Sequence, residues 1–90
     1  MNRVRFQVTD THRATEIQSE LMTRPEMIAV LLDEPWFIAL RSLNRRWECA
    51  NYNQDGDPWI EMPSESHDAE ACRKINRLFP ALLKVEEVPA

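Results

Sequence analysis

The predicted fold of this chain is decided by residues 47–72, WECANYNQDGDPWIEMPSESHDAEAC. Within them, Asp55-Gly56 separates two segments that carry aromatic and aliphatic residues. Glycine removes the Cβ penalty where a tight turn needs a positive φ, so this dipeptide is a strong hairpin signal. The stretch therefore predicts a hairpin with strands over about 46–53 and 58–62.

Two further elements adjoin this hairpin. Upstream, the segment WFIALRS at 36–42 precedes a second turn signal at Asn44-Arg45, where asparagine suits the first position of a tight turn. We therefore expect 36–42 to complete a three-stranded antiparallel meander. Downstream, Ser64 or Ser66 can cap a helix over about 66–79, because apolar residues recur there at helical spacing and Pro80 ends it.

The N-terminal third predicts a strand and two helices. Apolar and polar residues alternate in RVRFQV at 3–8, which is the signature of a half-buried strand. A helix over about 11–22 follows, and a capping box at 23–26 (TRPE) starts a second helix over about 24–33. Residues 27–32 are apolar on every side, so a strand is also compatible with them, and the capping box favours the helix.

We expect a single α+β domain over residues 1–90, in which the meander packs against the helices and a short strand forms at each chain end. The C-terminal strand comes from LLKVEEV at 82–88. If the third meander strand is set aside, the order strand, helix, strand, strand, helix, strand resembles a ferredoxin-like plan, which is the alternative architecture.

The sequence also predicts a cytoplasmic location. The longest apolar run, Met27 to Leu32, has six residues, far below the roughly 20 that a membrane-spanning helix needs. The N-terminus lacks the apolar core of a signal peptide. In the reducing cytoplasm, Cys49 and Cys72 are expected to be free thiols.

Two-residue loops at both turns would place Phe37 opposite Tyr52 and Tyr52 opposite Trp59. These three aromatic residues would then form a row across the meander, on the face that points away from the core. The row is either covered by the N-terminal segments or exposed as a binding patch. The core face would carry Trp36, Ile38, Leu40, Trp47, Cys49, Ile60 and Met62.

The stretch 47–72 is also acidic. The whole chain has a net charge of −4, yet this stretch contains no Lys or Arg. A solvated face is the commoner meaning of such a run, whereas a partner with a basic surface would use it for docking. Its carboxylates are Glu48, Asp55, Asp57, Glu61, Glu65, Asp68 and Glu70.

No motif in the sequence indicates catalysis, a metal site or a cofactor. Asn51 to Gly56 resembles the start of an EF-hand calcium loop, but Met62 stands where that loop has its final glutamate. Residues 66–68, Ser-His-Asp, are the three residue types of a hydrolase triad. The side chains of consecutive residues do not converge in space, however, as those of a triad must. We therefore predict that the protein is not an enzyme and holds no metal or cofactor.

Residues 45–52, RRWECANY, resemble the strand motif of RNA-recognition motifs at the basic start, at Trp47 and at Tyr52. Glu48 and Cys49 replace the glycine and the middle aromatic of that motif. The order helix, three strands, helix is also similar to that of double-stranded-RNA-binding domains. The resemblance to RNA-recognition motifs implies the alternative function, a single-stranded nucleic-acid-binding domain that stacks bases on the aromatic row. The acidic second turn argues against direct nucleic-acid binding.

We predict a small acidic protein-interaction module that docks on the basic surface of a larger partner, away from membranes. Its charge, its size and its lack of catalytic apparatus are similar to those of phage anti-restriction and anti-CRISPR proteins. That resemblance implies an inhibitor that mimics nucleic-acid charge to block a basic site. The partner's identity and the oligomeric state stay open. The expected partner-binding residues are Asp55, Asp57, Trp59, Glu61, Glu65, Asp68, Tyr52 and Phe37.

Overall fold

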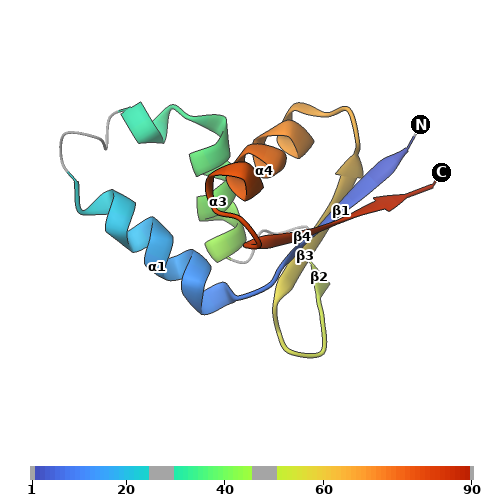
Figure 1. Ribbon diagram of the computed structural model, residues 1–90, viewed down its shortest axis with the longest axis horizontal. Helices are drawn as coiled ribbons and strands as arrows, with labels where there is room; N and C mark the ends of the chain where they lie inside the picture. The colour runs from blue at the N-terminus through green and yellow to red at the C-terminus, as the bar shows by residue number, and fades with distance from the viewer. Residues whose placement is uncertain (1, 25–29, 46–50, 90) are drawn as a thin grey trace.

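The alternation in RVRFQV produces a strand at the centre of the sheet. The computed structural model describes residues 2–24, 30–45 and 51–89, and Figure 1 shows the helices gathered on one side of the sheet. Its elements are β1 (Arg3–Val8), α1 (Thr11–Met22), α3 (Pro35–Asn44), β2 (Asn51–Tyr52), β3 (Pro58–Pro63), α4 (His67–Leu78) and β4 (Leu83–Val88).

The sheet has the strand order β2-β3-β1-β4, and every neighbouring pair is antiparallel. The predicted α+β class is therefore confirmed, together with the N-terminal and C-terminal strands. The helices predicted over 11–22 and 66–79 and the strand predicted over 58–62 agree with α1, α4 and β3 to within one residue at each end. With α3 left out, the described elements follow the order β-α-β-β-α-β of the ferredoxin-like plan.

Local capping explains why both of these helices begin where the sequence predicts. The Asp10 carboxylate accepts a hydrogen bond from the Arg13 N–H at 3.1 Å. The Ser66 hydroxyl accepts one from the Ala69 N–H, also at 3.1 Å. Each cap satisfies a backbone donor that has no partner inside the first turn of its helix.

The first strand of the predicted meander is wrong, because residues 35–44 form helix α3. Pro35 begins this helix, where its missing N–H costs no hydrogen bond and its fixed φ suits the helical backbone. Ile38, which the alternating pattern assigned to the core, is 49% exposed. The buried side chains of α3 instead recur at helical spacing: Trp36, Phe37, Ala39, Leu40 and Leu43.

Two predicted segments lie partly outside the described residues. Of the helix predicted over 24–33, residues 30–32 are helical, and 25–29 lie outside the description. Of the strand predicted over 46–53, β2 is the described part. The predictions for Trp47, Glu48 and Cys49 also fall outside the described residues.

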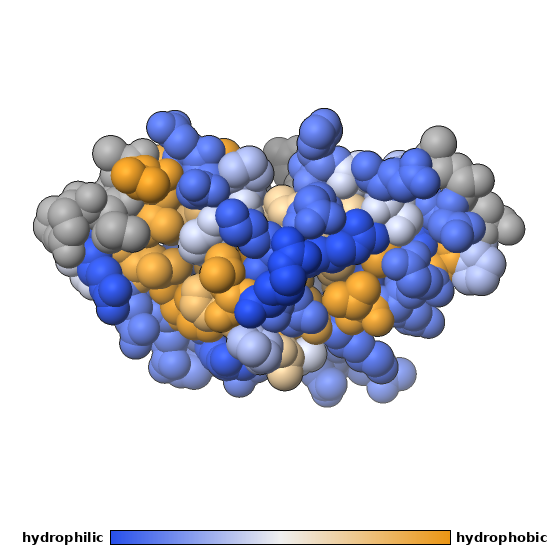
Figure 2. Space-filling view, turned by 45° about the horizontal axis from the view of Figure 1, so that its top comes forward, coloured by the Kyte–Doolittle hydropathy of each residue, from blue (hydrophilic) through white to orange (hydrophobic). Residues whose placement is uncertain are grey.

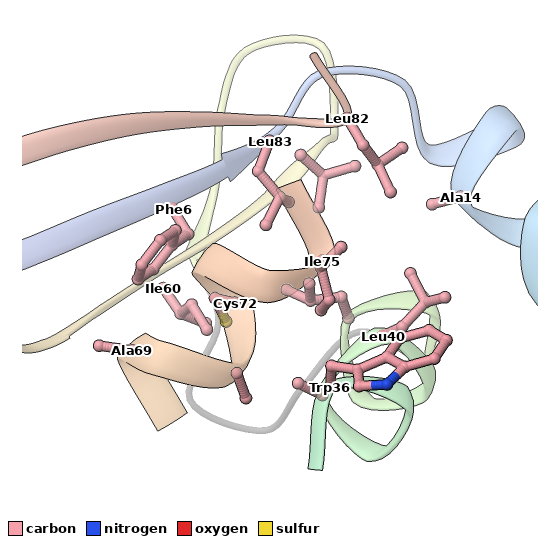
Figure 3. Packing of buried hydrophobic residues seen from close by; sticks show 14 of the residues in the cluster. Phe6, Ala14, Trp36, Leu40, Ile60, Ala69, Cys72, Ile75, Leu82 and Leu83 are labelled. Carbon is pink, nitrogen blue, oxygen red and sulfur yellow. The ribbon is translucent and has the colours of Figure 1, made fainter. Parts of the chain in front are cut away.

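The core lies between the inner face of the sheet and the helices. Phe6 of β1 and Ile60 of β3 are buried there, and Figure 3 shows both directed toward α4. Trp36 and Leu40 of α3 lie on the other side of α4 in the same view. Helix α4 therefore packs between the sheet on one side and α3 on the other, and its contact with α3 is the main junction of the helical layer.

The hairpin between β2 and β3 has a three-residue loop in place of the predicted two-residue loop. The Asn53 N–H donates to the Asp57 carbonyl at 3.0 Å, so residues 54–56 form the loop. Gly56 takes a φ of 82° at its last position. Hairpin loops of this length commonly combine a type I turn with a left-handed residue, which is the role that glycine fills here.

The additional loop residue shifts the pairing of β2 by one position. Asn51 lies opposite Trp59, and Tyr52 lies opposite Pro58. Because alternate residues of a strand point to opposite faces, Tyr52 and Trp59 no longer share a face. Phe37 is fully buried in α3. The predicted row of Phe37, Tyr52 and Trp59 is therefore wrong, and Trp59 alone of the three stays on the outer face.

Candidate interaction surfaces

The predicted partner-binding residues that are not buried in the core fall in four separate places. Asp55 and Asp57 lie in the β2–β3 loop region, and Trp59 and Glu61 lie on the outer face of the sheet. Tyr52 is exposed on the edge strand β2, whereas Phe37 belongs to the core. The fourth place is the start of α4, where Glu65 and Asp68 are exposed. The acidic stretch is thus divided by the fold rather than presented as one surface.

At the hairpin, Asp57 holds the loop against helix α1. The Asn53 side-chain oxygen accepts hydrogen bonds from the backbone N–H groups of Asp55 and Asp57 at 3.0 and 2.9 Å. The Asp57 carboxylate accepts a hydrogen bond from the Thr11 hydroxyl at 2.7 Å. Asp57 therefore has a structural role here, and Asp55 is the carboxylate that the hairpin exposes to solvent.

The outer face of the sheet carries charged side chains around Trp59. The Arg5 guanidinium carbon lies 4.1 Å from the centre of the Trp59 ring, a cation–π arrangement. Glu61 is 3.2 Å from Arg3 and 3.5 Å from Arg5, so β1 supplies two cations to this carboxylate. A cavity of about 200 Å³ beside Trp59 is lined by Arg5, Gln7, Asn53, Trp59, Lys84 and Glu86.

The junction of α3 and α4 contains two cavities that share Pro35, here named the first and second α3–α4 cavities. The first, of about 220 Å³, is lined by Glu34, Pro35, Trp36, His67, Glu70, Ala71, Lys74 and Arg77. The second, of about 200 Å³, is lined by Pro35, Ile38, Ala39, Ser42 and Asp68. Figure 2 shows more hydrophobic surface in the half of the molecule where the helices lie than in the half of the strand ends.

The charges around these two cavities differ. At the first cavity, Lys74 lies 3.9 Å from Glu34, and Arg77 lies 3.1 Å from Glu70. Both carboxylates of that rim are therefore matched by a cation. At the second cavity, Asp68 makes no ion pair with a described residue, and its charge is favourable at the positive N-terminal end of α4. The rim of the second cavity is consequently acidic.

The Cys72 side chain has no role at these surfaces, because it is free and buried in the core. The pKa of its thiol is raised from 9.0 to about 12, mainly by burial and in part by Asp68, while Arg73 acts in the opposite direction. A thiol with so high a pKa is protonated near neutral pH and is a poor nucleophile. In the described ranges, no three His, Cys, Asp or Glu side chains gather as ligands for a metal ion.

Comparison with protein families, with curated proteins and with solved structures finds no match to this chain. Among the residues that the structure describes, no helix has the length and apolar character needed to cross a membrane. The arguments on function therefore depend on the surfaces described above. Sequence reasoning found Asp68 but missed Pro35 and Ile38 beside it, because 36–42 was interpreted as a strand. The available signal was a proline at the first position of a segment whose apolar residues fit a helical period.

Proposed function

We propose that this chain is a protein-interaction module that binds a partner protein through the second α3–α4 cavity. The observation that carries the proposal is Ile38, which is 49% exposed at the wall of a cavity whose rim carries Asp68, a carboxylate without an ion pair to any described residue. Interface anchors are commonly apolar side chains in pockets surrounded by polar groups. The partner would place an apolar side chain against Pro35 and Ile38, with a Lys or Arg next to Asp68.

The size of the cavities supports a protein partner over a small molecule. Sites for small molecules usually have volumes of roughly 300–1,000 Å³. Each α3–α4 cavity has about 200–220 Å³ and opens beside exposed helix surface, which suits one anchoring side chain of a larger partner. The proposal keeps the predicted class of function, an acidic interaction module with a basic partner, and places the contact surface on the helical layer.

The nucleic-acid-mimic form of the prediction depends on carboxylates that are not neutralised internally. Glu61 and Glu70 each lie beside arginine side chains, and Asp57 is bound by a hydroxyl group. Within the described part of the acidic stretch, 51–72, the exposed carboxylates that lack such partners are Asp55 at the hairpin and Glu65 and Asp68 at α4. We therefore propose that inhibition of a basic site, if it is the biological role, uses the α4 end of the molecule.

A second candidate is binding of single-stranded nucleic acid on the outer sheet face. The observation in its favour is that Trp59 is accompanied there by three cations, Arg3, Arg5 and Lys84, and by two carboxylates. One aromatic side chain already stacked on Arg5 provides a weaker platform than several free rings. A mobility-shift titration at low salt tests this candidate, and a shift that is lost in Trp59→Ala would favour it over the helical surface.

The proposed protein contact is tested by affinity capture followed by reconstitution with the purified partner. The baits are the wild type and two single variants, Ile38→Arg and Asp68→Lys. Val30→Arg is the matched control, because Val30 is 58% exposed and lines neither α3–α4 cavity. We expect Ile38→Arg to weaken binding at least tenfold and Asp68→Lys to weaken it with a flatter salt dependence. Val30→Arg should bind as the wild type does.

Circular dichroism and urea unfolding of each bait separate loss of contact from loss of fold. A reconstituted partner that binds Ile38→Arg and Asp68→Lys as tightly as the wild type contradicts the proposal. Loss of binding in Asp55→Lys alone would instead place the contact at the hairpin. Because the Asp55 carboxylate is exposed and makes no hydrogen bond or ion pair with a described residue, its reversal is a clean comparison with the reversal of Asp68.

A further inference from the structure

The outer edge of β4 is the longest strand edge that the described sheet leaves without a neighbour. β4 pairs with β1 on one side and is the last strand in the order β2-β3-β1-β4. Four consecutive residues of β4, 84–87, are exposed, and Val85 keeps 40% of its surface accessible. An edge strand with free backbone groups is able to pair with another strand.

The hydrogen bonds at the start of β4 determine which backbone groups face outward. The Thr9 N–H donates to the Leu82 carbonyl at 3.1 Å, in the same register that joins β1 to β4. Residues alternate along an antiparallel ladder, so positions 84 and 86 direct their N–H and C=O groups to β1, as Leu82 directs its carbonyl. In agreement, the Leu83 N–H points away from β1 and donates to Asn76 of α4 at 3.2 Å. Positions 85 and 87 therefore present their backbone groups outward.

We propose that β4 pairs antiparallel with β4 of a second copy of this chain, with Val85 on the two-fold axis. A symmetric pair can be centred on residue 84, 85, 86 or 87. Centring on 84, 86 or 87 places Lys84, Glu86 or Glu87 directly opposite its own copy, and like charges in that position destabilise a sheet. Centring on Val85 places Lys84 opposite the partner copy's Glu86 twice, and it avoids every like-charge pair.

The register centred on Val85 also satisfies the outward backbone groups. The two valines exchange a pair of N–H···O=C bonds across the axis. Each Glu87 N–H then donates to the opposite Leu83 carbonyl, and the Leu83 N–H keeps its bond to Asn76. The valine side chains meet on the helix side of the sheet, so the apolar surface exposed at Val85 becomes buried. The product is a continuous sheet through both copies with an isologous interface.

The charges on an edge strand commonly prevent pairing, and the same charges here permit only one of the four registers centred on residues 84–87. That makes a charge-swap experiment decisive. Sedimentation equilibrium of the wild type from micromolar to millimolar concentration should show a monomer–dimer equilibrium. Lys84→Glu and Glu86→Lys each create two like-charge pairs, and each should raise the dimer dissociation constant at least tenfold. The double variant Lys84→Glu/Glu86→Lys exchanges the charges and should return the constant to within threefold of the wild type.

Mixing the single variants provides the sharpest readout. Lys84→Glu is acidic at both positions and Glu86→Lys is basic at both, so an equimolar mixture should form a heterodimer while each variant alone stays monomeric. Val85→Pro removes the outward N–H without removing a bond to β1, and it should be a folded monomer by circular dichroism. A wild type that remains monomeric at millimolar concentration overturns the proposal, as does a mixture or a double variant that does not restore the dimer.

Discussion

Replacing two adjacent residues of α3 with alanine distinguishes the helix from the strand that alternation predicts. Phe37 is fully buried, whereas Ile38 is 49% exposed. Removing a buried phenylalanine side chain costs about 3–5 kcal/mol, from lost transfer free energy and the cavity left behind. A half-exposed isoleucine on a helix should cost about 0.5 kcal/mol or less, because alanine also has the higher helix propensity. The order of the two effects is therefore the diagnostic quantity.

The expected loss is large against the whole stability of the chain. For 90 residues, a stability of roughly 0.05–0.15 kcal/mol per residue gives about 4.5–13.5 kcal/mol. Phe37→Ala should thus remove about a fifth or more of the free energy of unfolding. The measurement is urea unfolding followed by circular dichroism, with the midpoint and the m-value compared among wild type, Phe37→Ala and Ile38→Ala. If Phe37→Ala does not fold, Phe37→Leu provides a milder version of the same comparison.

A strand over 36–42 would reverse the result. In that arrangement Ile38 points into the core and Phe37 points away from it, so Ile38→Ala would be the costly change. Finding that Ile38→Ala destabilises the protein more than Phe37→Ala does would refute the assignment of α3 and, with it, both α3–α4 cavities.

Three further predictions concern Cys72, two left-handed backbone positions and a helix cap. The pKa of Cys72 is raised to about 12 in the folded state, so its stabilising contribution is complete below pH 9 and is lost as pH rises from 9 to 12. The loss amounts to about 4 kcal/mol at most, visible in urea titrations at increasing pH and absent in Cys72→Ala. Gly56 and Ala81 both have positive φ, at 82° and 67°. Gly56→Ala should therefore cost about 1 kcal/mol, whereas Ala81→Gly should be neutral or stabilising by up to about 1 kcal/mol. In thermal unfolding, a stabilising Gly56→Ala and a destabilising Ala81→Gly would contradict both assignments. Ser66→Ala removes the cap of α4 and should cost about 1 kcal/mol, with Ser66→Asp retaining most of it.

Local signals predicted those parts of the fold that depend on neighbouring residues. The caps at Asp10 and Ser66 determine where α1 and α4 begin, and each involves a contact only three residues away. The alternation of β1 likewise follows from a single strand with one buried face. These elements were predictable because the interactions that determine them join residues close together in the sequence.

The segment after Pro35 was not predictable from pattern alone. Its apolar residues fit a period of two, with Trp36, Ile38 and Leu40 on one side, and also a helical period through Trp36, Leu40 and Leu43. Packing against α4 favours the helical alternative, and that contact joins residues far apart in the chain. The prediction of the hairpin register was wrong for a related reason. Gly56 suits both a two-residue and a three-residue loop, and the two lengths place Tyr52 on opposite faces.

The acidic stretch illustrates the same limit for electrostatics. No cation occurs within residues 47–72, yet β1 delivers Arg3 and Arg5 to Glu61, and the later turns of α4 bring Arg77 to Glu70. A count of charges along the chain therefore overstates the charge that a partner would meet. The surface charge that remains is determined by the pairing of β1 with β3, which sequence reasoning about a local hairpin does not include.

The exposed carboxylates that remain in the described part of the acidic stretch lie toward the two ends of β3, and this separation governs how a partner would respond to them. β3 has six residues, so Asp55 at one end and Asp68 beyond the other lie about 20 Å or more apart at roughly 3.3 Å per residue. The Debye length at physiological ionic strength is about 8 Å, so the two ends attract a charged partner independently. Reversal of Asp55 should consequently leave binding at the α4 end unchanged at 0.15 M salt. An effect of Asp55→Lys on that binding, equal to the effect of Asp68→Lys under the same conditions, requires a partner that spans β3 and contacts both ends at once.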